Sequence, residues 1–132
     1  MIVREAIVAD PRVLQADVPV REAAVLLAKP HVASVFVADG DLLLGCVTVE
    51  ALVAAVAAGR DLRDLAVREL ADTDVPTVSP DVPLDEALIL MAEGGHERLA
   101  VVEEGRLLGI LPREPVVRRL AEDEQPPPSP ED

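Results

Sequence analysis

The chain contains two copies of one sequence pattern, offset by 64 positions. When residues 3–53 are aligned with residues 67–117, 17 of 51 positions are identical and no gap is needed. Chance would give roughly a tenth for this composition, so the pattern indicates an internal duplication. One copy of about 50 residues is too short to bury a sheet face alone. We therefore expect the two copies to share one core.

Each copy is predicted to fold as β-α-β-β-α. Residues 1–16 are expected to form an extended lead-in with a short strand near 12–15. A helix should begin at Asp17, whose carboxylate would cap it, and end at Pro30. A hairpin at 33–47 and a helix at 48–58 follow. Gly45 lies inside the second strand of that hairpin, which indicates that another backbone or a ligand comes close there.

The second copy repeats this plan with a strand at 75–78, a helix at 82–93, a hairpin at 98–111 and a helix to about 122. The predicted organisation is a first repeat at 1–59, a short helical connector at 60–66 and a second repeat at 67–122. Residues 123–132 are acidic and proline-rich without a hydrophobic residue, which is typical of a disordered tail. We expect the chain to be complete, with any effector domain on a separate protein.

Composition disfavours several functions. The formal net charge is −13, and the only aromatic residue is one Phe. Both features argue against nucleic-acid binding, and the charge also argues against binding to an anionic membrane. No apolar run reaches membrane-spanning length and no secretion signal is visible, so we expect a cytoplasmic protein. The single cysteine, Cys46, is predicted to be a small buried hydrophobic residue.

Three stretches together resemble the tandem CBS-domain pair, or Bateman module. They are VRELADTDVPTVSPDVPLDEAL (67–88), RLAVVEEGRLLGIL (98–111) and GCVT (45–48). The resemblance implies an α+β fold of two tandem β-α-β-β-α repeats, related by pseudo-two-fold symmetry and packed sheet to sheet. It also implies a regulatory module that binds AMP, ADP, ATP or S-adenosylmethionine in clefts between the halves. Such pairs assemble into flat dimers, so we expect a homodimer.

The family's binding corner reads Gly, two apolar residues, Ser or Thr, two variable residues, then Asp. In the first copy Gly45 and Thr48 fit, but Ala51 occupies the Asp position, whose carboxylate would accept the ribose hydroxyls. In the second copy Pro112 and Pro115 occupy the hydroxyl and Asp positions. Thr48 has two interpretations, a helix cap or a phosphate ligand, and the cap is the more common role of such a residue.

Further candidate ligand-binding residues follow from the resemblance. The lead-in segments would hold the base through their backbone, near Val8 and Ala9 in one cleft and near Asp72 and Thr73 in the other. Arg98 and Arg113 are candidate phosphate cations, although we expect ordinary surface solvation for both. Phe36 is bulky and either fills the space an adenine would need or belongs to the core. The histidines and turn carboxylates show no metal-ligand spacing, so no metal is expected.

Three functions remain open. The first is a sensor of an adenosine nucleotide or S-adenosylmethionine. The second is a dimerisation or protein-interaction module that has lost nucleotide binding and acts through helix faces containing Leu52, Val56, Val116 and Leu120. The third, a small enzyme, is disfavoured because no catalytic motif is present, and the chain is predicted not to be an enzyme. The sequence does not identify a protein partner.

Overall fold

The computed structural model describes residues 1–8, 12–30, 32–114 and 117–118. The first half contains a 3₁₀ helix η1 (Val3–Ala6), then β1 (Val13–Gln15), α1 (Val20–Leu27), β2 (Ser34–Asp39), β3 (Leu42–Thr48) and α2 (Val49–Ala57). Two 3₁₀ turns connect the halves, η2 (Leu62–Asp64) and η3 (Val67–Glu69). The second half contains β4 (Thr77–Val78), α3 (Leu84–Gly94), β5 (Arg98–Glu103) and β6 (Arg106–Pro112).

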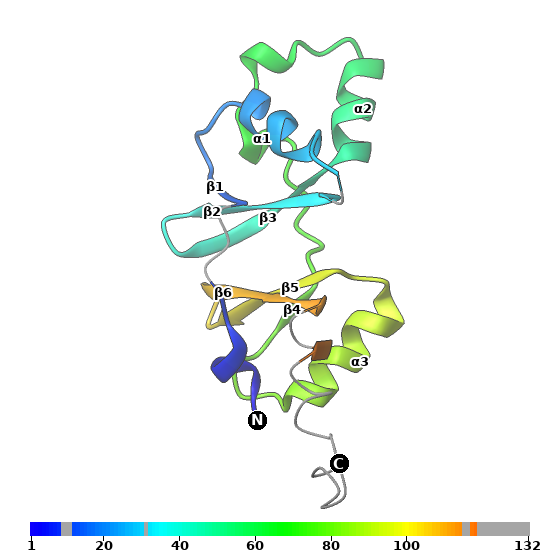
Figure 1. Cartoon of the computed structure of the whole chain (residues 1–132). Coiled ribbons are helices and arrows are strands. Elements are labelled where there is room, and N and C mark those ends of the chain that lie inside the picture. Colours follow the sequence, from blue (N-terminus) through cyan, green and yellow to red (C-terminus); the bar gives the residue numbers. More distant parts are fainter. Residues whose placement is uncertain (9–11, 31, 115–116, 119–132) are drawn as a thin grey trace, which may run out of the picture.

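The six strands form two three-stranded layers that pack face to face, with α1 and α2 outside one layer and α3 outside the other (Figure 1). The strand order is β1-β2-β3-β6-β5-β4, and β3 of one layer pairs with β6 of the other at Leu42 and Arg106. In each layer a parallel pair adjoins an antiparallel hairpin. The structure confirms the predicted α+β fold of two repeats packed sheet to sheet.

The duplication extends to details of strand pairing. The first hairpin changes register between Val37 and Ala38, and the second changes register between Val101 and Val102, 64 positions later. A β-bulge of this kind bends a strand and increases its twist. Because both hairpins bend at the same place, the two layers curve alike and can pack against each other across a pseudo-two-fold axis.

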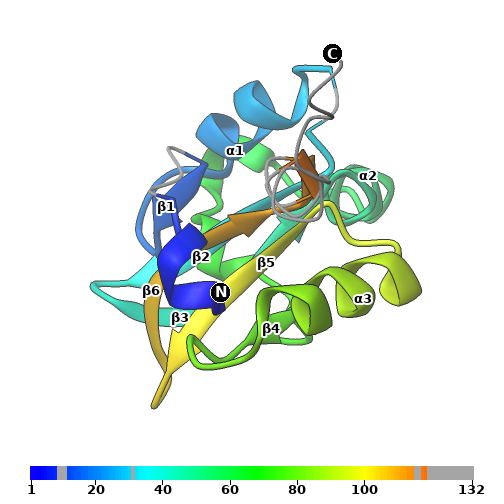
Figure 2. The ribbon, with the colours of Figure 1, turned by 60° about the horizontal axis from the view of Figure 1, so that its bottom comes forward.

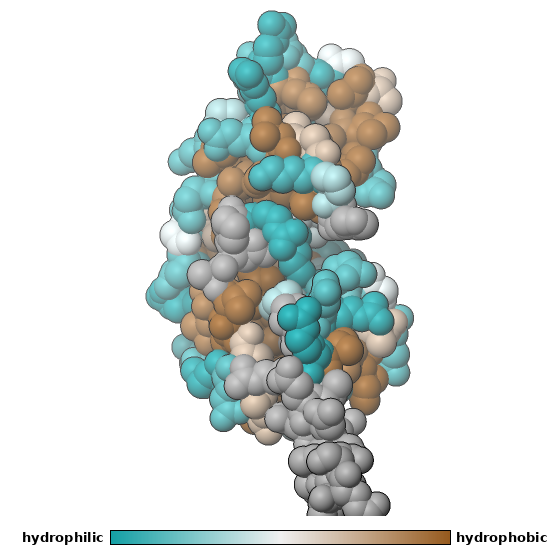
Figure 3. Space-filling model, viewed as in Figure 1, coloured by the Kyte–Doolittle hydropathy of each residue, from teal (hydrophilic) through white to brown (hydrophobic). Residues whose placement is uncertain are grey.

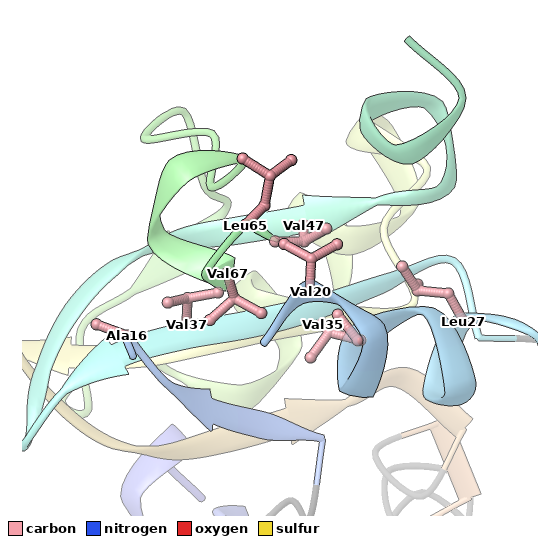
Figure 4. Packing of buried hydrophobic residues seen from close by; sticks show 9 residues of the cluster. Ala16, Val20, Leu27, Val35, Val37, Val47, Leu65 and Val67 are labelled. Atoms are coloured by element: carbon pink, nitrogen blue, oxygen red, sulfur yellow. The ribbon is translucent and has the colours of Figure 1, made fainter. Parts of the chain in front are cut away.

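Three hydrophobic clusters hold these layers together. Alternate residues of β2 point to opposite faces, as the period of a strand requires. Val35 and Val37 pack under α1 and α2 (Figure 4), while Phe36 packs between the two sheets. In β5, Val101 packs against α3 and Ala100 packs between the sheets. Both faces of each sheet are therefore buried, which explains why the strands read as continuous apolar runs.

The lead-in of each copy packs against the other copy. The N–H of Val3 donates to the carbonyl of Val82 (2.9 Å), so the N-terminal segment lies against the second half (Figures 1 and 2). The N–H of Val67 donates correspondingly to the carbonyl of Val18 (2.8 Å). The predicted short strand near residues 12–15 is present as β1, but the prediction of an extended lead-in was wrong at Val3–Ala6, where η1 forms. Each half is completed by the segment that precedes the other half.

The predicted Asp17 cap was also wrong. Helix α1 begins after Pro19 and has no side-chain cap, while the Asp17 carboxylate pairs with Arg68. The first free N–H of the helix, that of Val20, donates to the carbonyl of Leu65 (2.8 Å). A backbone carbonyl of the segment that connects the halves therefore satisfies this N–H at the helix end, in place of the Asp17 carboxylate that the sequence predicted. Helix α1 also ends at Leu27, earlier than Pro30.

Some predicted elements fall partly outside the described residues. Of the closing helix expected to reach about residue 122, residues 113–114 and 117–118 are helical. The acidic segment 123–132, Val116 and Leu120 lie outside the described residues. Within the described part of the chain, no helix is long and apolar enough to cross a membrane.

Candidate functional site: a pocket at the first strand-to-helix corner

Gly45 lies where the second lead-in meets the first hairpin. Cys46 and Asp72 exchange two backbone hydrogen bonds, of 3.0 Å to the Asp72 oxygen and 2.8 Å to the Cys46 oxygen. A Cβ on Gly45 would overlap the Asp72 carbonyl oxygen and lie 2.9 Å from its carbonyl carbon. The prediction that another backbone approaches Gly45 is confirmed. Only glycine leaves room for this bridge.

The second corner has the same backbone bridge. Val8 and Ile110 exchange two backbone hydrogen bonds, each of 3.0 Å. Gly109 precedes Ile110 as Gly45 precedes Cys46, and a Cβ on Gly109 would overlap the Ile7 side chain. Each lead-in therefore docks on the last strand of the opposite hairpin, immediately before the strand-to-helix corner.

A pocket of about 260 Å³ opens beside the first corner. Four segments line it, namely residues 33–34, residues 46 and 48 of β3, residues 72, 74 and 76, and residues 95–98, which lead into β5. Three residues predicted from the sequence, Thr48, Asp72 and Arg98, thus meet in one site although they are far apart in the chain. We call this site the corner pocket.

Thr48 ends β3 and caps α2. Its Oγ1 accepts a hydrogen bond from the N–H of Ala51 (3.1 Å), and its backbone is extended, as an N-cap requires. The structure therefore shows the cap that the sequence favoured. Ala51, at the position where the family has an aspartate, has no side-chain acceptor for a ribose. Any ribose acceptor in this pocket must come from another segment.

Arg98 lies at the start of β5 and is only 9% exposed. Its guanidinium donates to the carbonyl oxygen of Ser34, and its Cζ lies 5.4 Å from the centroid of the Phe36 ring. The expectation of a solvated surface arginine was wrong. The strand that carries Arg98 starts at the junction of the two halves, so the side chain spans that junction. Phe36 is 2% exposed and belongs to the core between the sheets.

Two exposed carboxylates, those of Asp72 and Asp74, line the pocket. The Asp72 carboxylate accepts the N–H of Asp74 (2.9 Å), which fixes the turn that follows the backbone bridge. These groups affect Cys46, a buried thiol as the sequence predicted. Burial raises the pKa of Cys46 most, Asp72 raises it further, Arg98 lowers it, and Asp74 adds a smaller increase. The two carboxylates therefore disfavour the thiolate of Cys46, which lies at the floor of the pocket.

The other predicted site residues lie elsewhere. Val8 belongs to the second corner, and Thr73 is exposed but does not line the corner pocket. Arg113 is half-buried and lines a separate shallow depression of about 360 Å³ with Glu97 and Glu114. Ala9 lies outside the described residues. The structure thus brings together three of the seven candidates.

Among the pocket residues that sequence reasoning missed are His96, Glu97 and Asp74. His96 is half-buried, and its ring lies against Gly94. The repeat contained a usable signal, because residues 96–98 align with residues 32–34, which also approach the junction. Among the described residues, no group of three or more His, Cys, Asp or Glu side chains is arranged to hold a metal ion.

The two halves match the model of one domain family. Residues 3–58 and residues 67–122 each match the CBS domain. The chain belongs to the CBS-domain family, as a tandem pair. The fold and the duplicated corners agree with this assignment. CBS pairs of this kind are regulatory modules.

Solved structures share the whole fold. An acetoin utilization protein (AcuB) from Vibrio cholerae is 25% identical, with a TM-score of 0.78 over 96% of this chain and 98% of that chain. CBSX2, solved in complex with AMP, is also 25% identical, with a TM-score of 0.74 over 94% of this chain and 98% of that chain. The CBS pair of MJ0100 was solved with 5′-methylthioadenosine and S-adenosyl-L-methionine. It is 23% identical, with a TM-score of 0.67 over 95% of this chain and 98% of that chain, and at this identity the likeness supports the fold alone.

One curated relative is an enzyme. The A-adding tRNA nucleotidyltransferase of Aquifex aeolicus is 28% identical over 122 residues, which is 92% of this chain but 14% of that protein. The chain therefore spans about one seventh of the length of this relative. The likeness concerns a segment of the relative, and the prediction that this chain is not an enzyme stays a prediction.

Proposed function

We propose that this CBS pair senses an adenosine compound, which binds in the corner pocket. The observation that carries the proposal is the meeting of Thr48, Asp72 and Arg98 at one pocket of about 260 Å³ between the halves. Typical small-molecule pockets begin at about 300 Å³, so this one suits a single nucleoside or nucleotide better than a dinucleotide. CBSX2, with the same fold and 25% identity, was solved with AMP.

Different residues of the pocket contact the ribose and the base of such a ligand. The carboxylates of Asp72 and Asp74 supply the ribose acceptors that Ala51 lacks. The apolar wall for the base comes from Ala33 and Pro76. Because the pocket contains residues from both halves, a bound ligand stabilises one relative position of the halves. A ligand that favours one arrangement shifts the population toward it, which is the basis of regulation by a module of this kind.

We expect one ligand per chain. At the second corner Pro112 replaces Thr48, so neither a hydroxyl nor a backbone N–H is present at that position. Val8 likewise replaces Asp72, which removes a carboxylate. The two corners share a backbone arrangement, but the first has the polar groups that a ribose and its 5′ substituent need.

A second function is favoured by the outer face of α2. Val49, Val53 and Val56 follow one another at helical spacing and are 40%, 61% and 59% exposed. Figure 3 shows a large apolar area over this helix. An exposed apolar stripe of this kind is typical of a protein interface. The corresponding proposal is a homodimerisation or protein-interaction module that needs no nucleotide.

Isothermal calorimetry with adenosine, AMP, ADP, ATP and S-adenosylmethionine distinguishes the two functions, with guanosine as the control ligand. A ligand at a hundred times its Kd should also stabilise the fold by about 2.7 kcal/mol, which raises Tm by several degrees. The blocking variant is Ala33→Trp, which fills the pocket wall. Its matched control is Ala58→Trp, at the exposed far end of α2.

Binding of one adenosine compound per chain, lost in Ala33→Trp and retained in Ala58→Trp, supports the sensor. Absence of heat and of any Tm change across the whole panel refutes it and favours the interaction module. Equal binding of guanosine would show that the base is not recognised, which also contradicts the proposal.

A further inference from the structure

The corner pocket has an unequal balance of charges. Three carboxylates line it, those of Asp72, Asp74 and Glu97, and one guanidinium, that of Arg98. All three carboxylate residues are exposed. The three carboxylates and one guanidinium together carry a net charge of −2, and the net charge of the whole chain, −13, has the same sign. An adenosine ligand would therefore place its 5′ group in a negative field.

The positive groups at the pocket are engaged within the protein. The Arg98 guanidinium donates to the Ser34 carbonyl and lies over the Phe36 ring. The N-terminus of α2 adds the equivalent of roughly half a positive charge. Thr48 already uses its hydroxyl to accept the N–H of Ala51. Half a charge and one engaged guanidinium do not balance three carboxylates.

The buried thiol at the floor of the pocket is consistent with this imbalance. Burial is the largest cause of the raised pKa of Cys46, Asp72 raises that pKa further, Arg98 lowers it, and Asp74 adds a smaller increase. The carboxylates therefore disfavour a negative charge on a neighbouring group in the pocket. A phosphate chain entering the same space would experience the same sign of interaction.

We propose that the corner pocket selects adenosine compounds whose 5′ substituent is uncharged or cationic, and that it discriminates against adenosine polyphosphates. This inference rests on the proposed function and specifies its ligand class. Adenosine and S-adenosylmethionine represent the favoured class, and ATP represents the disfavoured one. AMP, with a single phosphate near the positive end of α2, falls between them.

The test is calorimetric titration of the full chain with adenosine, S-adenosylmethionine, AMP and ATP at pH 8 in EDTA, so that no divalent cation masks the phosphates. At about 20 mM salt we expect ATP to bind at least tenfold more weakly than adenosine. The difference should shrink as salt rises, because the Debye length falls from about 10 Å at 0.1 M to about 3 Å at 1 M.

The matched variants are the double substitution Asp72→Asn with Asp74→Asn, and the single control Asp64→Asn. Asparagine keeps the side-chain oxygen that accepts the N–H of residue 74, so the turn has its acceptor. Asp64 is exposed on η2, which packs against α1 outside the sheets. We expect the double variant to reduce the ATP-to-adenosine ratio of Kd to about threefold or less, and the control to leave it unchanged.

Each outcome decides between the claims. ATP binding as tightly as adenosine overturns the selection by charge and leaves the sensor standing. A tenfold preference that survives in the double variant also overturns it, because the carboxylates would then not be its source. If no adenosine compound binds the unsubstituted chain, the proposed function fails and this inference fails with it.

Discussion

The substitution Gly45→Ala tests the backbone bridge that forms the corner pocket. The added methyl would overlap the Asp72 carbonyl oxygen, lie 2.9 Å from the Asp72 carbonyl carbon and lie 3.2 Å from the Ala71 Cβ. Two of these three atoms belong to backbone, which cannot rotate away as a side chain can. Either the methyl is forced into the packed space or the lead-in separates from β3.

Both responses are costly. Inserting a methyl into a packed interior costs about 1–3 kcal/mol. Separation loses the two hydrogen bonds between Cys46 and Asp72, each worth about 0.5–1.5 kcal/mol. We therefore expect a loss of about 1–3 kcal/mol in the free energy of unfolding. For a chain of this size that lowers Tm by about 4–12 °C, measured by circular dichroism during heating.

Two other glycine substitutions serve as controls. In Gly109→Ala the methyl overlaps the Ile7 Cγ2, the end of a side chain that can rotate, and lies 3.1 Å from the Val8 oxygen. We expect about half the loss seen for Gly45→Ala. Gly59 has φ +79° and open space around it, so Gly59→Asn should change Tm by no more than about 4 °C.

The reasoning is refuted if Gly45→Ala melts within 3 °C of the unsubstituted chain, or if Gly109→Ala is the less stable of the two. Either result would mean that the backbone contact at Gly45 does not hold the lead-in as firmly as the structure indicates. The corner pocket would then lack the fixed wall on which its proposed recognition depends.

Three further predictions concern the pocket and the outer face of α2. Thr48→Ala should lower the unfolding free energy by about 1 kcal/mol in urea titrations, while Thr48→Ser, which keeps the capping hydroxyl, should lose less. Cys46 should react slowly with iodoacetamide at pH 8, because its pKa is raised in the folded state. Its contribution to the free energy of unfolding should be complete below pH 9.0, the ordinary pKa of the thiol, and should decline as the pH rises further. Val53→Glu places a charge on a residue that is 61% exposed, so it should convert the expected homodimer to a monomer by light scattering; a dimer that persists would exclude this face.

The sequence predicted the elements that local rules determine. The Asp39-Gly40-Asp41 turn and its flanking apolar runs give the hairpin β2–β3, and Gly40 has the positive φ, 62°, that the turn needs. Gly45 was predicted correctly as a point of close approach, because a glycine inside a strand has few other roles. The repeat then transferred each of these inferences to the second half.

Features set by contacts between distant segments were not predictable in this way. Asp17 satisfies the local rule for a helix cap, yet it pairs with Arg68 because the connector crosses the helix end. Arg98 reads as a surface residue in its own strand, and its burial depends on the packing of the other half over it. The sequence therefore predicted candidate binding residues, but only the structure shows which of them line one pocket.

The duplication relates the two corners, which differ at three of the residues discussed above: Thr48, Asp72 and Arg98 correspond to Pro112, Val8 and Ser34. Arg98 and Ser34 occupy equivalent positions 64 residues apart, and the Arg98 guanidinium donates to the carbonyl of its own equivalent. Equivalent residues meet in this way only near the pseudo-two-fold axis. Two arginines there would repel each other, so a long basic side chain at one position favours a small residue at the other. The two copies thus share the backbone bridge at each corner, while Thr48, Asp72 and Arg98 line one pocket at the first corner.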